Sequence, residues 1–384
     1  MNFVNEFIEE IQRQKSELLS LLGRREPNEL EVRLRKQLLT HWHHLPNGES
    51  SSSREFSVDS SSASRSLLNG IDLFIVRALM LGSDGSRFKK MNFEMMRGIT
   101  DPTLASRFER ILRDLIEIQI VVENCPHSAG DLVLIDGNLY GRYTHLKEQI
   151  DIRGWEYLPL LLFEAMQKMF EACREKEITV IGVSKFSKTR VLSHALLAEM
   201  GYPQKLLDIP DVEMLYRWRW GEKGFTTPLL LGEYAFVDEV RAMGDEPERY
   251  IHRYFYKLPK NLWEWGVEVI EKVPQAPAIV MFHMIPERGE QPLRIDVPAN
   301  CLGMNDRITD VSPFRFADAS VVEGVLKQLL ADWGGRDVYN ALLYVVDREV
   351  KLTPNVVDKV YRSILGSELE MPIEYDRSSR RFYG

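Results

Sequence analysis

Residues 54–82 read REFSVDSSSASRSLLNGIDLFIVRALMLG, and this stretch decides the fold class. A short apolar run ends on Asp59, a serine-rich segment follows, and a turn signal at Asn69-Gly70 precedes a long apolar run. Apolar runs on both sides of an Asn-Gly turn are typical of a β-hairpin. We therefore predict two strands, the first of which ends at Asp59. A carboxylate in that position is either a solvated turn residue or a metal ligand at the end of a strand.

The composition of the 384-residue chain is that of a globular protein, with 44% hydrophobic and 28% charged residues. No apolar run reaches the roughly 18 residues that span a bilayer, so we expect no membrane association. Three scattered cysteines are too few for a disulfide framework or a zinc site, which favours a reducing cytoplasm. The net charge of -8 disfavours a protein that coats nucleic acid with a broad basic surface. It is compatible with an enzyme that has one narrow basic channel.

The pattern predicts four segments along the chain. Residues 1–45 are expected to form a helical hairpin for dimerisation or packing, because apolar residues recur there at helical spacing. The serine-rich residues 46–53 are expected to be a flexible linker. Residues 54–353 form the main domain, with an irregular, partly β insertion over about 200–300, and residues 354–384 form a C-terminal extension.

The order of elements within the main domain predicts its fold. After the hairpin come a third alternating strand at 88–96, a long helix at 104–124 and a buried strand that ends at Asp136-Gly137. A second buried strand at 178–184 and a late helix at 337–353 follow. This succession is that of the ribonuclease H-like fold. We therefore predict an α/β protein with a ribonuclease H-like mixed sheet flanked by helices.

Four acidic residues fall where that fold gathers carboxylates. Asp59 ends the first predicted strand, Glu117 lies on the long helix, Asp136 ends the fourth strand and Asp347 lies on the late helix. Four carboxylates in one cleft repel one another, and divalent cations with a preference for oxygen ligands relieve this repulsion. Two such ions about 3.5–4 Å apart can activate water for phosphodiester hydrolysis. The alternative to a metal site is that the two strand-end aspartates are turn residues and that Asp347 begins a solvated helix face.

Five motifs resemble, in order and spacing, those of the NurA nuclease family: SVDSSSASRSLLNGIDLFIVRALML, VLIDGNLYGR, VIGVSKFSKTR, PLRIDVPA and YNALLYVVDREVKLT. The resemblance extends from about Phe56 to Thr353. It implies a DNA nuclease that depends on Mn2+ (or Mg2+) and acts on free ends and single strands. It also implies a homodimer that works with the hexameric ATPase HerA in processing double-strand breaks.

The resemblance also implies roles for individual acids. Asp59 matches the first acid of the family, although Asp-Ser-Ser replaces the usual Asp-Gly-Ser, and Asp136 matches the acid of the Asp-Gly-x-Leu motif. Glu117 is the best match to the helix glutamate, with Asp114 one turn away as the alternative ligand. Asp347 stands where the family typically has a histidine. An aspartate can bind the same ion but cannot act as a proton shuttle near neutral pH.

Two further residues match the motifs. Lys185 matches the family's basic residue and can hold a phosphate oxygen as a point charge. Tyr339 matches the tyrosine before the last motif and either orients a ligand or packs in the core. The departure at Asp347 keeps a second function open, that of a catalytically weakened assembly or regulatory module of an ATPase ring. We expect Asp296 to be structural, with Arg294 as its partner.

Overall fold

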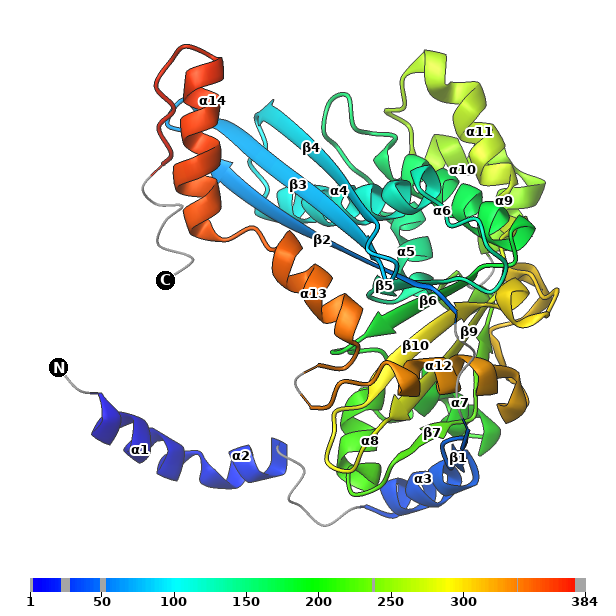
Figure 1. The fold of residues 1–384 in the computed structure, drawn as a ribbon. Helices are drawn as coiled ribbons and strands as arrows, with labels where there is room; N and C mark the ends of the chain where they lie inside the picture. The colour runs from blue at the N-terminus through cyan, green and yellow to red at the C-terminus, as the bar shows by residue number, and fades with distance from the viewer. Residues whose placement is uncertain (1–2, 22–27, 49–52, 237–238, 337, 377–384) are drawn as a thin grey trace.

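The computed structural model describes residues 3–21, 28–48, 53–236, 239–336 and 338–376 (Figure 1). Its strands are β1 Trp42–His43, β2 Glu55–Ser66, β3 Ile71–Gly82, β4 Arg87–Arg97, β5 Leu132–Asp136, β6 Thr179–Ser184, β7 Gly224–Thr226, β8 Leu229–Leu231, β9 Ile279–Ile285, β10 Leu293–Pro298 and β11 Phe314–Phe316. They form one mixed sheet in the order β1-β7-β9-β10-β6-β5-β2-β3-β4, with β8 paired to β9 and β11 paired to β8.

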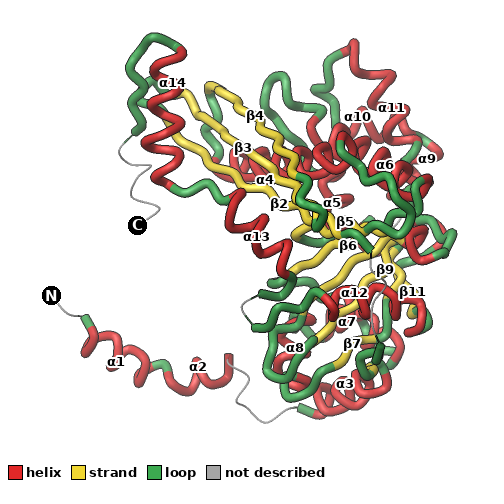
Figure 2. Tube along the Cα trace, viewed as in Figure 1, coloured by secondary structure: helices red, strands yellow, loops and turns green. Residues whose placement is uncertain are grey.

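Helices cover both faces of this sheet (Figure 2). They are α1 Val4–Arg13, α2 Lys15–Leu21, α3 Glu29–Thr40, α4 Pro102–Glu123, α5 Leu139–Tyr143, α6 Leu158–Glu175, α7 Val191–Glu199, α8 Asp211–Arg219, α9 Glu239–Asp245, α10 Pro247–Tyr254, α11 Trp263–Glu271, α12 Glu323–Ala331, α13 Ala341–Val350 and α14 Arg362–Glu368. None of the described helices is long and apolar enough to cross a bilayer.

The first strand is longer than the sequence indicated. β2 continues through the serine-rich segment and pairs with β3 as far as Ser66 opposite Asp72, so the prediction that the strand ends at Asp59 is wrong. Serine favours turns when its backbone lacks a partner, but the apolar strand β3 offers a ladder partner to every residue of β2. The turn at Asn69-Gly70 is confirmed, and Gly70 has the positive φ of 73° that such a turn requires.

The predicted ribonuclease H-like core is confirmed. β2, β3 and β4 are antiparallel, whereas β5 and β6 continue the sheet in parallel with β2. α4 and α6 cover one face in a core that includes Val58, Phe74 and Val133. α13 covers part of the other face, where Val346 packs with Leu79. The irregular region predicted around 200–300 supplies β9 and β10, which extend the same sheet beyond β6.

The N-terminal helices differ in whether they pack against the rest of the protein. α3 is anchored to the body by Leu34 and Leu38, which are both buried. α1 has no buried residue, and α1 and α2 lie apart from α3 and the sheet (Figure 1). The expected helical hairpin is therefore not formed by these helices within this chain. Residues 22–27, between α2 and α3, and residues 49–52 of the predicted linker lie outside the described residues.

Gly182 in β6 allows the turn after β5 to approach closely. A Cβ atom at this position would lie 2.7 Å from the carbonyl oxygen of Gly137 and 2.9 Å from the Cγ of Leu139. We expect Gly182→Ala to lower the free energy of unfolding by about 1–3 kcal/mol, because the turn would have to move to relieve the overlap. The midpoint of urea denaturation measures this change. Gly221→Ala is the matched control, since a Cβ there meets nothing within 4 Å. An equal effect of the two substitutions would contradict this account.

Candidate active site

The register between β2 and β5 sets two carboxylates side by side. The strands are parallel, and Val58 is opposite Ile135, so the next residue on each strand is an aspartate, Asp59 and Asp136. Strands of one sheet are about 4.8 Å apart, which brings these side chains within strong electrostatic reach. β5 ends at Asp136, and the chain turns at Gly137 with a φ of 105° that favours glycine.

All four predicted acids line one open pocket of about 560 Å3: Asp59, Glu117, Asp136 and Asp347. Burial raises the pKa of Asp59 from its ordinary 3.8 to about 7, and the negative charge of Asp136 adds to this effect. The charge of Asp347 acts in the same direction. The pocket therefore combines burial with the mutual repulsion of several carboxylates.

Asp347 reaches the pocket because α13 is anchored at both ends. Asn340 caps the helix by accepting a hydrogen bond of 2.8 Å from the backbone N–H of Leu343. Further along, Val346 and Val350 are buried against β3. Asp347 is half-buried at the mouth of the pocket.

Glu117 is buried on α4 and is engaged by a basic residue. Arg142 donates a hydrogen bond of 2.7 Å from Nη2 to Oε2 of Glu117, and the Ser60 hydroxyl lies 3.4 Å from the same oxygen. Oε1 of Glu117 has no hydrogen-bond partner in the described part of the chain. Burial raises the pKa of Glu117 to about 8, against the opposing charge of Arg142. This carboxylate therefore belongs to the pocket wall and retains one free oxygen.

Asp114, the alternative to Glu117, also lines the pocket but has partners of its own. His145 contacts it at 3.1 Å through Nε2, and Arg142 lies 3.7 Å away. Burial alone would raise the pKa of Asp114, but the charge of Arg142 and the hydrogen bond to His145 outweigh it and lower this pKa. Of the two residues, Glu117 is therefore the better candidate ligand, because one of its carboxylate oxygens has no partner among the described residues.

Arg142 is a site residue that the sequence interpretation missed. It is buried, pairs with Glu117, and donates a hydrogen bond of 3.2 Å to the carbonyl oxygen of Asp136. The signal for it was available, because Arg142 lies six residues after Asp136 in the quoted motif VLIDGNLYGR. Arg113 also lines the pocket, and Arg110 and Glu148 line both this pocket and a neighbouring one that reaches Arg107. A basic wall therefore borders the carboxylates.

Lys185 and Tyr339 lie beside Asp136 and contact each other. Lys185 donates a hydrogen bond of 3.2 Å from Nζ to Oδ2 of Asp136, and Nζ lies 4.2 Å from the centre of the Tyr339 ring. The Tyr339 hydroxyl is buried without a hydrogen-bond partner among the described residues. Burial raises the pKa of Tyr339, and the charges of Asp136 and Asp59 raise it further, so the phenol stays protonated and can donate.

The donor set suits a hard divalent cation. Carboxylate oxygens are the ligands that Mg2+ and Mn2+ prefer, and Mg2+ commonly binds to one or two carboxylates while it retains several waters. The pair Asp59 and Asp136 fits this pattern, and a cation there would offset both the burial and the repulsion from Asp136 that raise the pKa of Asp59. Among the described residues, no three His, Cys, Asp or Glu side chains are grouped so as to enclose an ion. The four carboxylates share a pocket without forming a closed cage.

Asp296 lies outside this set. Arg294 donates to it at 2.8 and 3.0 Å, both residues are buried, and the backbone N–H of Tyr140 donates to Oδ2 of Asp296 at 3.0 Å. The predicted structural pair of Asp296 with Arg294 is confirmed. It ties β10 to the start of α5, the helix that carries Arg142.

Comparisons with known proteins agree with this architecture. The model of the NurA domain family matches residues 54–352. No curated protein sequence matches the chain. The structure is similar to that of the NurA nuclease from Sulfolobus solfataricus, with 15% identity, a TM-score of 0.62, and coverage of 96% of this chain and 98% of the other. It is also similar to a structure of NurA with manganese, with 13% identity, a TM-score of 0.54, and coverage of 94% and 98%.

A third similar structure is described as NurA bound to dAMP and manganese. It is 12% identical to this chain, with a TM-score of 0.55 and coverage of 93% of this chain and 96% of the other. At these identities, the structural likeness establishes the fold, and the match of the family model over residues 54–352 establishes the family.

The raised pKa of Asp59 predicts a pH-dependent loss of stability. Between about pH 4 and pH 7 the folded chain holds a proton that the unfolded chain has released, so stability falls as the pH rises through this window. We expect Asp59→Asn to raise the free energy of unfolding at pH 8 by on the order of 2 kcal/mol, since one pKa unit corresponds to about 1.4 kcal/mol and solvent screens part of the effect. At pH 4 the gain should vanish.

Urea denaturation in EDTA at the two pH values measures the effect. Asp151→Asn is the control, because Asp151 is exposed and pairs with Lys257 away from the pocket. A gain of the same size at pH 4 and pH 8 would show that the ionisation of the buried Asp59 carboxyl is not its cause.

Proposed function

This chain belongs to the NurA family, and from that premise we propose that it is a metal-dependent DNA nuclease that hydrolyses phosphodiester bonds at DNA ends and in single strands. One observation carries the proposal: the register of β2 and β5 places Asp59 and Asp136 next to each other in a pocket that arginines also line, and Lys185 contacts Asp136. The similar structures described as holding manganese and dAMP support Mn2+ (or Mg2+) as the cofactor and DNA as the substrate.

In the proposed mechanism Asp59 and Asp136 would hold the cation, and Glu117 and Asp347 would complete the carboxylate set. A bound divalent cation supplies Lewis acidity, which polarises the phosphate and lowers the pKa of water. Arg142 fixes the turn after β5 through the carbonyl oxygen of Asp136, so the two aspartates keep their relative position as charge changes in the pocket.

The basic residues hold the substrate. Lys185 is close enough to Asp136 to share its charge with a phosphate oxygen bound beside that carboxylate. The protonated Tyr339 hydroxyl, which has no partner in the described part of the chain, can donate a hydrogen bond to the same phosphate. Arg113 lies along the pocket wall and can contact the phosphate of an adjoining nucleotide, whereas Arg110 is paired with Glu148.

Two features of the site favour a second function. Glu117 is paired with Arg142, and an aspartate stands at position 347 where the family typically has a histidine. These features weaken the case for fast chemistry and suit a catalytically weakened assembly or regulatory module of an ATPase ring. Nuclease activity that depends on the two central aspartates decides between the alternatives.

We expect the full-length chain to cleave labelled single-stranded and duplex DNA in the presence of Mn2+ and to lose this activity in EDTA. Asp59→Ala and Asp136→Ala should each reduce the rate at least about a hundredfold, because each removes half of the central carboxylate pair. Gel electrophoresis of end-labelled DNA measures the rate. Asp151→Ala, which removes an exposed carboxylate, should retain it.

The same assay tests Lys185. Lys185→Ala should raise KM for DNA severalfold, while Lys188→Ala, three residues along the same loop, should change it little. Wild-type protein that shows no cleavage, alone or with its ATPase, would refute the nuclease proposal and support the assembly module.

We also propose that the chain forms a homodimer in the cytoplasm and acts with a HerA-type hexameric ATPase in DNA end processing. The exposed apolar residues Phe3, Phe7 and Ile8 of the N-terminal helical segment support a protein contact there. Light scattering should give twice the mass of the chain, and Phe7→Lys should shift the mass toward that of the monomer. Thr103→Lys, at an exposed position on α4, is the control. A wild-type monomer would contradict the dimer, and failure to retain the ATPase in a pull-down would contradict the partnership.

A further inference from the structure

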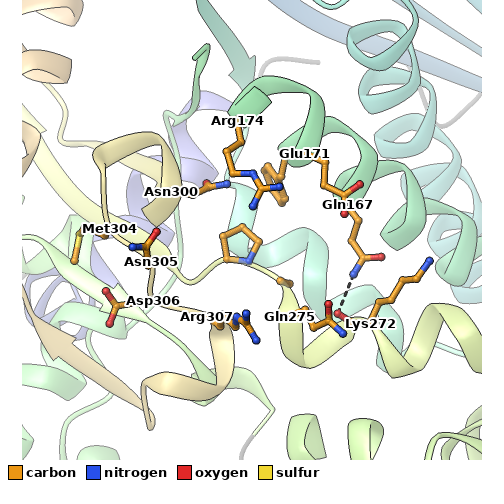
Figure 3. A pocket seen from close by; sticks show the side chains of 13 residues that line it. Gln167, Glu171, Arg174, Lys272, Gln275, Asn300, Met304, Asn305, Asp306 and Arg307 are labelled. Atoms are coloured by element: carbon orange, nitrogen blue, oxygen red, sulfur yellow. Dashed lines mark hydrogen bonds between the residues drawn. The ribbon is translucent and has the colours of Figure 1, made fainter. Parts of the chain in front are cut away.

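A second pocket, of about 490 Å3, lies near the amino end of β6. Figure 3 shows the side chains that line it. Its walls are the last turns of α6, the turn Val273–Gln275, the turn Ala299–Leu302 after β10, and residues 304–307. The carboxylate pocket lies at the carboxyl ends of β5 and β6, whereas α6 leads into the amino end of β6. The six residues of β6 correspond to roughly 20 Å between the two ends.

The pocket carries positive charge that is not neutralised by ion pairs within the described part of the chain. Arg174, Lys272 and Arg307 line it, and none of them forms an ion pair with another described residue. Of the two carboxylates in the lining, Asp306 is paired with Arg315 at 2.7 Å outside the pocket, which leaves Glu171. Figure 3 shows the guanidinium group of Arg174 directed into the pocket. An anionic group is therefore the complementary ligand.

The pocket also offers an unused amide and an apolar floor. Oδ1 of Asn300 is buried and has no hydrogen-bond partner in the described part of the chain, and Asn300 lies beside Arg174 (Figure 3). A buried acceptor without a donor is costly, so a rotation of the amide that brings Oδ1 to the pocket, where a ligand supplies an N–H group, would be favoured. Phe170, Ala276 and Pro277 form the apolar part of the lining, against which a flat ring can lie.

We propose that this pocket is a second, non-catalytic site for a nucleotide. The phosphate binds Arg174 and Arg307, the base lies against Pro277, and an exocyclic amine of the base donates to Oδ1 of Asn300. The volume is within the range of small-molecule sites. This site does not depend on cleavage in the carboxylate pocket, because its ligand follows from its own charges and hydrogen-bonding groups. A free mononucleotide and the terminal nucleotide of a strand present the same chemistry.

The test is calorimetric titration of the full-length chain with dAMP in EDTA, which prevents metal-dependent cleavage. In EDTA the carboxylate pocket repels phosphate, so binding there is disfavoured. We expect Arg174→Glu combined with Arg307→Glu to weaken dAMP binding at least tenfold. Asn300→Leu should weaken dAMP severalfold but leave the affinity for inorganic phosphate unchanged. Arg249→Glu, at an exposed position on α10, should alter neither affinity.

Thermal melts of each variant establish that it is folded, and a 5′-phosphorylated trideoxyadenylate separates the two sources of the ligand. Tighter binding of the trinucleotide than of dAMP, lost in the double variant, assigns the site to a strand end, and the opposite order assigns it to the free nucleotide. The proposal is overturned if wild type binds neither compound. It is also overturned if the double variant binds dAMP normally while Lys185→Ala does not, since the nucleotide would then occupy the carboxylate pocket.

Discussion

The repulsion between Asp59 and Asp136 is the interaction on which the site depends. The parallel register of β2 and β5 fixes the two carboxylates on neighbouring strands, and burial in the pocket keeps water from screening their charges. The consequence is visible in the pKa of Asp59, which rises to about 7. Two carboxylates that the sheet holds together in this way favour the binding of a cation, and basic residues of the surrounding chain lie next to them.

Basic side chains of the protein neutralise part of the negative charge of the carboxylates. Arg142 lies between Glu117 and the turn after β5, while Lys185 contacts Asp136 from the next strand. These contacts leave the pocket open to solvent, and arginine side chains remain in its lining. The same residues that balance the carboxylates are suited to bind phosphate. The carboxylates of the pocket outnumber its arginines, so a bound divalent cation would be needed before a phosphate could approach them.

The two ends of the sheet differ in chemistry. The carboxyl ends of β5 and β6 gather acids and attract cations, whereas the pocket near the amino end of β6 presents unpaired arginines and an unused amide. This division places metal chemistry and anion binding about one strand length apart in the same rigid sheet. A nucleotide at the second pocket would therefore be held without competing for the carboxylates.

The sequence determined the order of strands and helices, because apolar periodicity and the Asn69-Gly70 turn are local signals, and it identified Asp136 because that residue directly follows a buried strand. It misplaced the end of β2, since only pairing with β3 keeps the serine-rich segment extended. Tertiary structure alone decided that Arg142 takes one oxygen of Glu117. It also decided that α1 leaves its apolar face exposed. Both outcomes depend on whether these residues contact others that are distant in the sequence. No local sequence pattern predicts such contacts.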